Sequence, residues 1–281
     1  DKPIVMTSEK EEPGAWGGIH ICGRAHTNAE GGKGSSEIGG AVYGGNDDAD
    51  NSGTLQYIRL EYTGFAFDEE HEANGISFYG VGNGTIVDHC QAYKGSDDGF
   101  EFFGGSVNVS NLVAVSCSDD SFDWTEGWNG KGTNLVAYQE AESTLGYDCD
   151  CLMECDNNGS NNAATPVAHP VLKNLILVGN GGSKQGIRLR AGTEVEIDNA
   201  KVCGKGQPLT VETALTENAL KNGTSKLTNI TLTSELSSKE GIYTHADFIA
   251  VTSNKVDANL SYSSFEDIRK ECSWMNGSWV K

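Results

Sequence analysis

The sequence predicts an all-β fold, a single-stranded right-handed parallel β-helix in which the chain winds as a solenoid with loop insertions. Two observations predict it. A strand pattern recurs every 22 to 24 residues, and the 281 residues include 36 Gly but only 5 Pro. Glycine usually makes up about 7% of a chain, and here it follows no Gly-X-Y period. This excludes a collagen helix and indicates many tight turns.

The recurring pattern is a polar residue, a small residue and then alternating apolar residues. It occurs at residues 74–80, 98–104, 120–126 and 185–191, and the first three copies start 24 and 22 residues apart. A second set of short, β-branched segments lies between these copies. No helical segment separates the strands, so they cannot be βαβ units. A register that repeats coil after coil favours a solenoid over a sandwich.

In a solenoid of this kind, equivalent positions of successive coils lie about 4.8 Å apart, and inward side chains stack in rows. We expect Phe100 to stack on Phe122 and Phe102 to lie beside Trp124. The rows should continue into the coils on either side, through Ile76 and Phe78 in one direction and Ile187 and Leu189 in the other.

The pattern predicts a single β-helix domain over residues 1–281. Helical signals are confined to residues 211–221 and 264–271. The second lies in a segment, about residues 260–281, that we expect to cap the open end of the solenoid and so prevent edge pairing. Longer stretches interrupt the period and are expected to form loops on one face. These stretches are residues 125–132, 140–149 and 156–170.

The charge of the chain limits its partners. It has 40 acidic and 20 basic side chains, a net charge of −20, so a nucleic-acid partner is not expected. The longest apolar runs are far shorter than the roughly 20 residues of a membrane helix. No phosphate-binding glycine loop or serine nucleophile elbow occurs, and no organic cofactor is expected.

The cysteines favour an exported protein. An even number, 8, occurs in a chain that opens in a strand-like segment without a signal peptide, as expected of a mature form. We expect a disulfide within or from the cluster Cys149, Cys151 and Cys155 rather than a zinc site. Cys90 lies in an apolar run and is expected in the core.

Several motifs resemble the right-handed parallel β-helix proteins of the pectin-lyase-like superfamily, and more narrowly bacterial cell-envelope and lipoprotein β-helix proteins. The resemblance covers roughly residues 3 to 200. It implies the fold and an exported location, at the bacterial cell surface, in the outer envelope or outside the cell, and it implies no specific activity. The motifs are PIVMTS at 3–8, WGG at 16–18, NSGTLQYIRLEY at 51–62, EANGI at 72–76, SDDGFEFFGGSVN at 96–108 and DDSFD at 119–123.

Aligning the repeats predicts two outward rows of side chains. The first contains Ser77, Glu101, Asp123, Glu154 and Arg188, although a shift of one residue would replace Glu154 by Met153. The second outward row contains Tyr79, Phe103, Thr125, Asp156 and Arg190. In this alignment Glu154 pairs with Arg188, and Asp156 pairs with Arg190, as ion pairs.

Glu101 and Asp123 are like charges in adjacent coils, which destabilise a sheet unless a cation, a raised pKa or a neighbouring base compensates them. Ca²⁺ prefers such clusters of oxygen ligands. The alternative is that the paired aspartates cap the turn backbone. The candidate Ca²⁺ ligands are Asp97, Asp98, Glu101, Asp119, Asp120 and Asp123.

The wider superfamily implies possible chemistry on this face. Its acidic-polysaccharide lyases use Ca²⁺ held by Asp and Glu with an Arg base, and its polygalacturonase-type hydrolases use an Asp-Asp pair near an Arg-X-Lys element. Asp97-Asp98 and Arg188-Leu-Arg190 are similar to the hydrolase elements, but its Gly-His-Gly element is absent. The acidic segment at residues 69–72 is interpreted as a solvated turn.

The favoured hypothesis is an exported cell-surface β-helix protein that binds extracellular carbohydrate or another surface ligand, assisted by Ca²⁺. Tyr79, Phe103 and Trp128 are expected to be exposed and to stack on sugar rings. The alternatives are a polysaccharide lyase or glycoside hydrolase that uses the same face, and a structural adhesin stalk without a catalytic site. The predicted ligand-binding residues are Glu101, Asp123, Glu154, Arg188, Arg190, Tyr79, Phe103 and Trp128.

Overall fold

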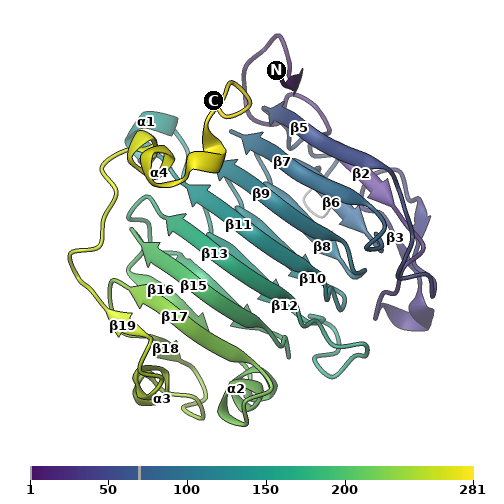
Figure 1. The fold of residues 1–281 in the computed structure, drawn as a ribbon. Coiled ribbons are helices and arrows are strands. Elements are labelled where there is room, and N and C mark those ends of the chain that lie inside the picture. Colours follow the sequence, from purple (N-terminus) through teal and green to yellow (C-terminus); the bar gives the residue numbers. More distant parts are fainter. Residues whose placement is uncertain (1, 69–70) are drawn as a thin grey trace.

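The computed structural model describes residues 2–68 and 71–281, and over these residues the chain winds through two large parallel sheets (Figure 1). From β5 to β19, successive strands alternate between the two sheets, so that each full coil contributes one strand to each. Parallel crossovers of this kind are right-handed in nearly all proteins. The predicted right-handed parallel β-helix is therefore confirmed.

The two sheets differ in strand length and in strand number. The nine-stranded sheet contains, in spatial order, β1 (Ile4–Met6), β5 (Thr54–Glu61), β7 (Ile86–Tyr93), β9 (Asn108–Val115), β11 (Lys131–Tyr138), β13 (Val171–Val178), β15 (Glu196–Cys203), β17 (Lys226–Leu232) and β19 (Lys255–Val256). The eight-stranded sheet contains β2 (Ile19–Cys22), β6 (Ile76–Tyr79), β8 (Phe100–Phe103), β10 (Phe122–Thr125), β12 (Met153–Asp156), β14 (Gln185–Arg190), β16 (Gln207–Val211) and β18 (Ser237–Ser238).

The core lies between the sheets and is built from the predicted inward rows. Phe100 and Phe122 are register partners whose rings stack 5.6 Å apart, and Phe78 stacks on Phe102 at 5.0 Å. Trp124 is also buried, and its Nε1 donates a hydrogen bond to Thr193 Oγ1. The alternation of apolar and other residues in each strand therefore sets which side chains fill the solenoid.

A row of asparagines lies at the same bend of four strands of the nine-stranded sheet, β9, β11, β13 and β15. Asn111, Asn134, Asn174 and Asn199 all have φ between 55° and 65°, a region that Asn tolerates better than most residues. Their amides hydrogen-bond from coil to coil, with Asn134 donating to Asn111 at 2.8 Å. This asparagine row fixes the register on the outer side of the sheet.

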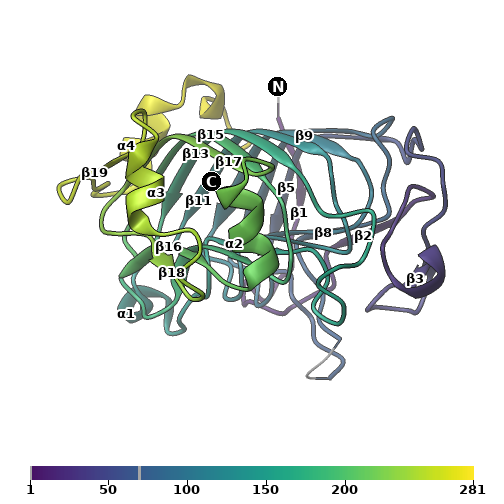
Figure 2. The same ribbon diagram turned by 90° about the horizontal axis from the view of Figure 1, so that it is seen from below.

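Helices close the C-terminal end of the solenoid. Figure 2 looks along the solenoid and shows α2 (Ala214–Lys221) and α3 (His245–Ala250) across its opening. Leu220 of α2 and Phe248 of α3 are part of the main core. This corrects the expectation that the segment from about residue 260 to 281 forms the cap.

The segment of residues 260–281 instead lies on the outer face of the nine-stranded sheet. It contains α4 (Phe265–Glu271) and the 3₁₀ helix η2 (Ser273–Met275), drawn in yellow in Figure 1. Ile268 and Met275 pack against outward apolar residues such as Val113 and Val136. The strands of the nine-stranded sheet are apolar on both faces, so the outer face also has to be covered. The expectation from the sequence did not take this second apolar face into account.

A second cover lies on the other sheet. The short antiparallel strands β3 (Gly34–Ser35) and β4 (Val42–Tyr43) form a hairpin that follows η1 (Glu30–Gly32). Tyr43 packs on Tyr79, with ring centroids 5.0 Å apart. The hairpin thus covers the N-terminal part of the eight-stranded sheet's outer face. The remaining helix, α1 (Glu142–Leu145), lies in the predicted insertion at residues 140–149.

The cysteines form no disulfide, since all eight are free thiols and only Cys22 is exposed. The predicted disulfide of the cluster Cys149, Cys151 and Cys155 is therefore wrong. An extended chain advances about 3.3 Å per residue, so Cys151 and Cys155 lie too far apart to bond to each other. Cys155 is an inward core residue beside Trp124, and Cys90 is buried as predicted.

Candidate functional site

The first outward row forms on the eight-stranded sheet as predicted. Ser77 pairs with Glu101, Glu101 with Asp123, Asp123 with Glu154, and Glu154 with Arg188. Met153 points into the core, where it is buried beside Ile187. The alternative alignment with Met153 in this row is therefore excluded.

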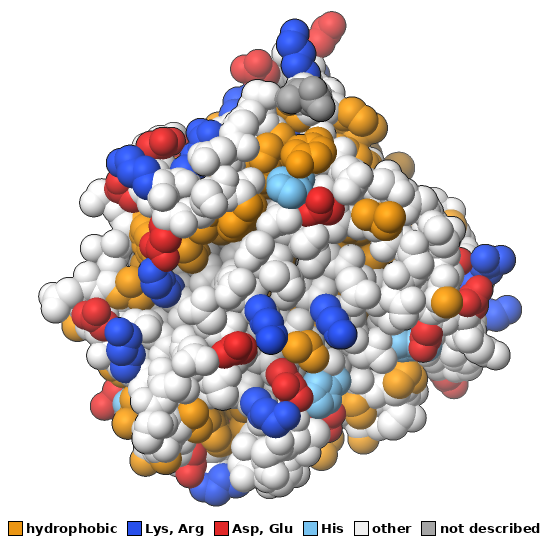
Figure 3. Space-filling view, viewed as in Figure 1, with side chains coloured by type: hydrophobic (Ala, Val, Ile, Leu, Met, Phe, Trp, Pro, Cys, Tyr) orange, Lys and Arg blue, Asp and Glu red, His pale blue; other side chains and the backbone are white. Residues whose placement is uncertain are grey.

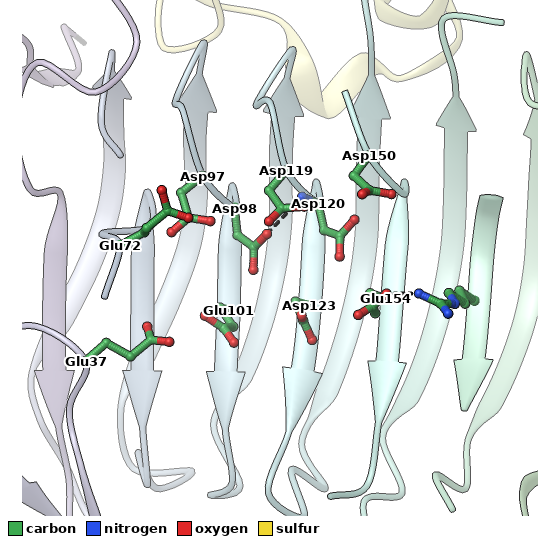
Figure 4. Close-up of a pocket in the computed structure, with 11 residues that line it drawn as sticks. Glu37, Glu72, Asp97, Asp98, Glu101, Asp119, Asp120, Asp123, Asp150 and Glu154 are labelled. Carbon is green, nitrogen blue, oxygen red and sulfur yellow. Dashed lines mark hydrogen bonds and ion pairs between the residues drawn. The ribbon is translucent and has the colours of Figure 1, made fainter. Parts of the chain in front are cut away.

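These side chains form the floor of an acidic groove of about 400 Å³ (Figure 4). Figure 4 shows carboxylates reaching into it from the neighbouring strands β8, β10 and β12 and from the corners that precede them. Ten of its eleven lining residues are acidic, which makes the groove suited to a positively charged occupant. The lining residues are Glu37, Glu72, Asp97, Asp98, Glu101, Asp119, Asp120, Asp123, Asp150, Glu154 and Arg188.

The opposite side of the molecule has no comparable concentration of one charge. Figure 3 views the outer face of the nine-stranded sheet, where acidic and basic side chains are few and interspersed over a mainly uncharged surface. The net charge of −20 is therefore distributed unevenly, because a quarter of the 40 acidic residues line one groove.

Two aspartates at the strand corners have a structural role as well. Asp98 Oδ1 accepts the backbone N–H of Asp120 at 2.8 Å, and Asp120 Oδ1 accepts that of Cys151 at 2.6 Å. Each bond links one coil to the next. The turn-capping alternative is thus confirmed for these two residues, but it accounts for only part of the hydrogen-bonding capacity of each carboxylate.

Asn74 occupies the corner equivalent to Asp98 in the preceding coil and is only 1% exposed. Its Nδ2 donates hydrogen bonds to Glu101 Oε2 at 2.6 Å and to Ser77 Oγ at 2.9 Å. Its Oδ1 is buried and has no partner in the described part of the chain. An unsatisfied buried oxygen costs about 1–3 kcal/mol, so this corner of the groove is incompletely satisfied by the protein alone.

Burial and mutual repulsion raise the pKa values of the groove carboxyls. The pKa rises to about 7 for Asp97 and to about 6 for Asp119, in each case through burial first and neighbouring carboxylates second. The same causes raise the pKa values of Asp98, Glu101 and Asp123 well above their usual range. Without a cation, several of these groups remain protonated near neutral pH.

The C-terminal end of the groove is compensated by basic side chains. Arg188 Nη1 lies 2.9 Å from Glu154 Oε1, and Arg190 pairs with Asp156, as predicted for the two rows. Arg190 also pairs with Glu154, across the rows. Arg188 also pairs with Glu212 at 3.2 Å. Each arginine thus pairs with two carboxylates, and these ion pairs keep the net charge at this end of the groove close to zero.

Asp150 pairs with Lys184, but five other groove carboxylates have no such partner in the described part of the chain. Asp97, Asp98, Glu101, Asp119 and Asp123 form no ion pair within the described residues. Their oxygens come together in two sets, each with ligand atoms within 4.8 Å of one another. Carboxylate oxygens are the ligands of hard divalent cations such as Ca²⁺, so the residues present fit such an ion. The two sets are Asp97, Asp98 and Asp119, and Asp98, Glu101 and Asp123.

The predicted aromatic platform is wrong. Tyr79 is 0%, Phe103 8% and Trp128 1% exposed. The β3–β4 hairpin covers Tyr79, which stacks on Phe103 at 4.4 Å, and Trp128 folds into the core against Phe102 at 4.1 Å. None of these rings can stack on a sugar in this structure.

Three carboxylates in the groove were not among the predicted site residues. Glu37 comes from the β3–β4 hairpin, Glu72 from the loop before β6, and Asp150 from the corner before β12. The interpretation of residues 69–72 as a solvated turn is wrong for Glu72, which is half-buried and lines the groove. Residues 69 and 70 lie outside the described residues. Asp150 occupies the same corner position in its coil as Asp97 and Asp119 do in theirs. Aligning the repeats could therefore have identified it.

Comparisons with known proteins give a family. Neither the curated proteins nor the solved structures include a match. Among the described residues, no helix has the length and apolar character required to cross a membrane. A family model described as a pectate-lyase like beta helix domain matches residues 1–280, in agreement with the parallel sheets and the repeat. The chain therefore belongs to the pectate-lyase-like β-helix domain family.

Proposed function

We propose that this protein is an exported, cell-surface β-helix protein that binds extracellular carbohydrate in its acidic groove with the help of Ca²⁺. The observation that carries the proposal is the groove itself, where ten carboxylates converge and the only basic lining residue is already paired. Membership of a pectate-lyase-like family supports a carbohydrate-related role.

The groove offers a sugar no exposed aromatic platform, since Tyr79, Phe103 and Trp128 are buried. Binding would rest on polar contacts and on a cation. Ca²⁺, when bound, supplies positive charge and coordination positions that sugar hydroxyl or carboxylate oxygens can occupy. The residues that would hold it are the uncompensated carboxylates Asp97, Asp98, Glu101, Asp119 and Asp123.

The test is binding to a panel of acidic and neutral polysaccharides, measured with Ca²⁺ and with excess chelator. We expect binding to at least one polymer, its loss in chelator, and at least tenfold weaker binding by Glu101→Gln. Glu235→Gln removes an exposed carboxylate outside the groove and is the matched control. Absence of binding to every polymer would contradict the proposal and favour a structural stalk.

The second candidate is a glycoside hydrolase acting on the same face. Glu101 and Asp123 favour it, because they are register partners whose pKa values are both raised, and such a pair can share one proton and so supply both an acid and a base. A lyase with Arg188 as the base is less well supported, since its two carboxylate partners raise the pKa of Arg188 and keep it charged. Product formation that is lost in Glu101→Gln but kept in Arg188→Lys would establish hydrolysis over binding alone.

A further inference from the structure

The two sets of uncompensated carboxylates in the groove share one member. Asp97, Asp98 and Asp119 form the first set, and Asp98, Glu101 and Asp123 form the second. We propose that the groove holds two divalent cations, one in each set, with the Asp98 carboxylate bridging them. The proposal rests on the cation of the proposed function and specifies where it binds and in what number.

Asp98 has the capacity to bridge. An ionised carboxylate has about four lone-pair positions, and Asp98 uses one for the backbone N–H of Asp120. It lies at the corner before β8 and belongs to both sets. Glu101 and Asp123 extend from adjacent strands, whereas Asp97 and Asp119 lie at the corners that precede those strands (Figure 4).

When all five carboxyls of the two sets are ionised, their charge favours more than one divalent cation. They contain five different carboxylates, and none of the five has an ion-pair partner in the part of the chain that the structure describes. One divalent cation would leave three of the five negative charges uncompensated in a largely buried site. Two would leave one, which a bound ligand or a single proton can accommodate.

Asn74 gives an independent indication of an occupant. Its side chain is 1% exposed and points into the cluster, where Nδ2 donates to Glu101 Oε2 at 2.6 Å. The amide oxygen is buried without a partner among the described residues. Side-chain amide oxygens are also ligands of Ca²⁺, so a cation or its coordinated water beside Glu101 would satisfy this unpaired oxygen.

A third cation is not expected. Asp120, Cys151 and Glu154 also bring ligand atoms within 4.8 Å of one another. However, Glu154 is paired with Arg188 and Arg190 through both of its oxygens. The positive charges of the two arginines oppose a cation there, so the proposed sites end at Asp123.

Isothermal titration of the full chain with Ca²⁺, after chelator treatment, tests the proposal. We expect two Ca²⁺ per chain for the wild type and for the control Glu235→Gln. Asp119→Asn and Glu101→Gln should each retain one, and the double variant none. Asp98→Asn, which keeps an oxygen to accept the Asp120 N–H, should weaken both sites at least tenfold. Native mass spectrometry counts the ions independently.

A stoichiometry of one in the wild type, or loss of both ions in each single variant, would overturn the bridged pair. Unfolding of each variant by denaturant separates misfolding from ligand loss, and the variants should fold because each removes a repelled charge. Two bound ions without any polysaccharide binding would contradict only the proposed function. Polysaccharide binding that persists without bound Ca²⁺ would contradict the bridged pair and the role of Ca²⁺ in binding, but not carbohydrate binding by the groove.

Discussion

Trp128 shows how the environment of a single residue decides between a core and a binding role. It follows β10 in a loop that the sequence marks as an insertion, and its indole returns to the core. There it stacks on Phe102 at 4.1 Å, while Nε1 donates a hydrogen bond to the carbonyl oxygen of Val107. Both the apolar and the polar parts of the side chain are therefore satisfied inside the solenoid.

We predict that Trp128→Ala lowers the free energy of unfolding by about 3–5 kcal/mol, the usual cost of removing a large buried aromatic side chain. Urea or guanidinium unfolding measures it. Phe67→Ala, at a position 67% exposed, is the aromatic control and should change stability by less than about 0.5 kcal/mol. A stable Trp128→Ala that loses only carbohydrate binding would restore Trp128 as a ligand-stacking residue.

The phase of individual side chains could be predicted wherever strands alternate regularly. Phe100, Phe122 and Glu101 all lie on the predicted faces because a strand points successive side chains to opposite sides. The exposure of Tyr79 could not be predicted in this way. It depends on Tyr43, a residue of a hairpin 36 positions earlier whose docking leaves no periodic signal.

At the scale of elements, the asparagine row links the bends of four neighbouring strands of the nine-stranded sheet. Asn134 has φ of 61° and lies between Asn111 and Asn174, bonded to both through its side-chain amide. Two effects are combined at this position: tolerance of the left-handed backbone and the coil-to-coil hydrogen bonds. Substitutions can separate them.

We predict that Asn134→Gly destabilises the protein less than Asn134→Ala. Glycine keeps the positive φ and loses only the side-chain bonds, whereas alanine also adopts a strained backbone, at a further cost of about 1 kcal/mol. Chemical unfolding of both variants measures the difference. Equal stability of the two would mean that the backbone conformation relaxes and that only the amide bonds matter.

The cap formed by α2 depends on one buried carboxylate. Glu217 accepts hydrogen bonds from the backbone N–H groups of Glu240, Ile242 and Tyr243, at 2.6 to 3.0 Å. Burial would raise the pKa of Glu217, but these donors outweigh it and hold that pKa below its usual value. Through these hydrogen bonds, the carboxylate holds the loop before α3 against α2.

We predict that Glu217→Ala costs about 3 kcal/mol or more, because it leaves three backbone donors unpaired. Amide hydrogen exchange should show faster exchange at residues 240–243 and little change in the groove. Thr216→Val, at the buried neighbouring residue, is the control for the exchange at residues 240–243, because it leaves the Glu217 bonds intact and removes instead the bond that Thr216 accepts from the Gly192 N–H. Unchanged exchange in the loop of Glu217→Ala would contradict this role.

The helices that cover the solenoid were the elements whose positions the sequence predicted least well. Residues 211–221 and 264–271 were predicted to be helical, and α2 and α4 lie there. Which surface each helix covers depends on apolar side chains elsewhere, such as Val113 and Val136 on the outside of the nine-stranded sheet. The repeat predicts the coils and, apart from the choice between Glu154 and Met153, their register, but insertions between coils carry no information on their docking partners.

At the scale of the whole molecule, the groove makes stability depend on pH and on cations. The pKa is raised to about 7 for Asp97 and for Glu37, and to about 6 for Asp119. Their usual values are near 4. Between about pH 4 and pH 7 these groups bind more protons in the folded chain than in the unfolded chain, so the free energy of unfolding contributed by the groove falls as pH rises.

In excess chelator, we therefore predict a lower melting temperature at about pH 8 than at about pH 5. Saturating Ca²⁺ should remove most of this fall, because a bound cation replaces the protons that the carboxylates lose, and it stabilises the folded state by mass action. Thermal unfolding across this range, with chelator and with Ca²⁺, measures both effects. The Asp97→Asn, Asp119→Asn double variant should show a shallower fall in chelator, whereas Glu235→Gln should follow the wild type. A melting temperature with the same pH dependence in chelator and in Ca²⁺ would mean that the acidity of the groove is balanced by protons alone.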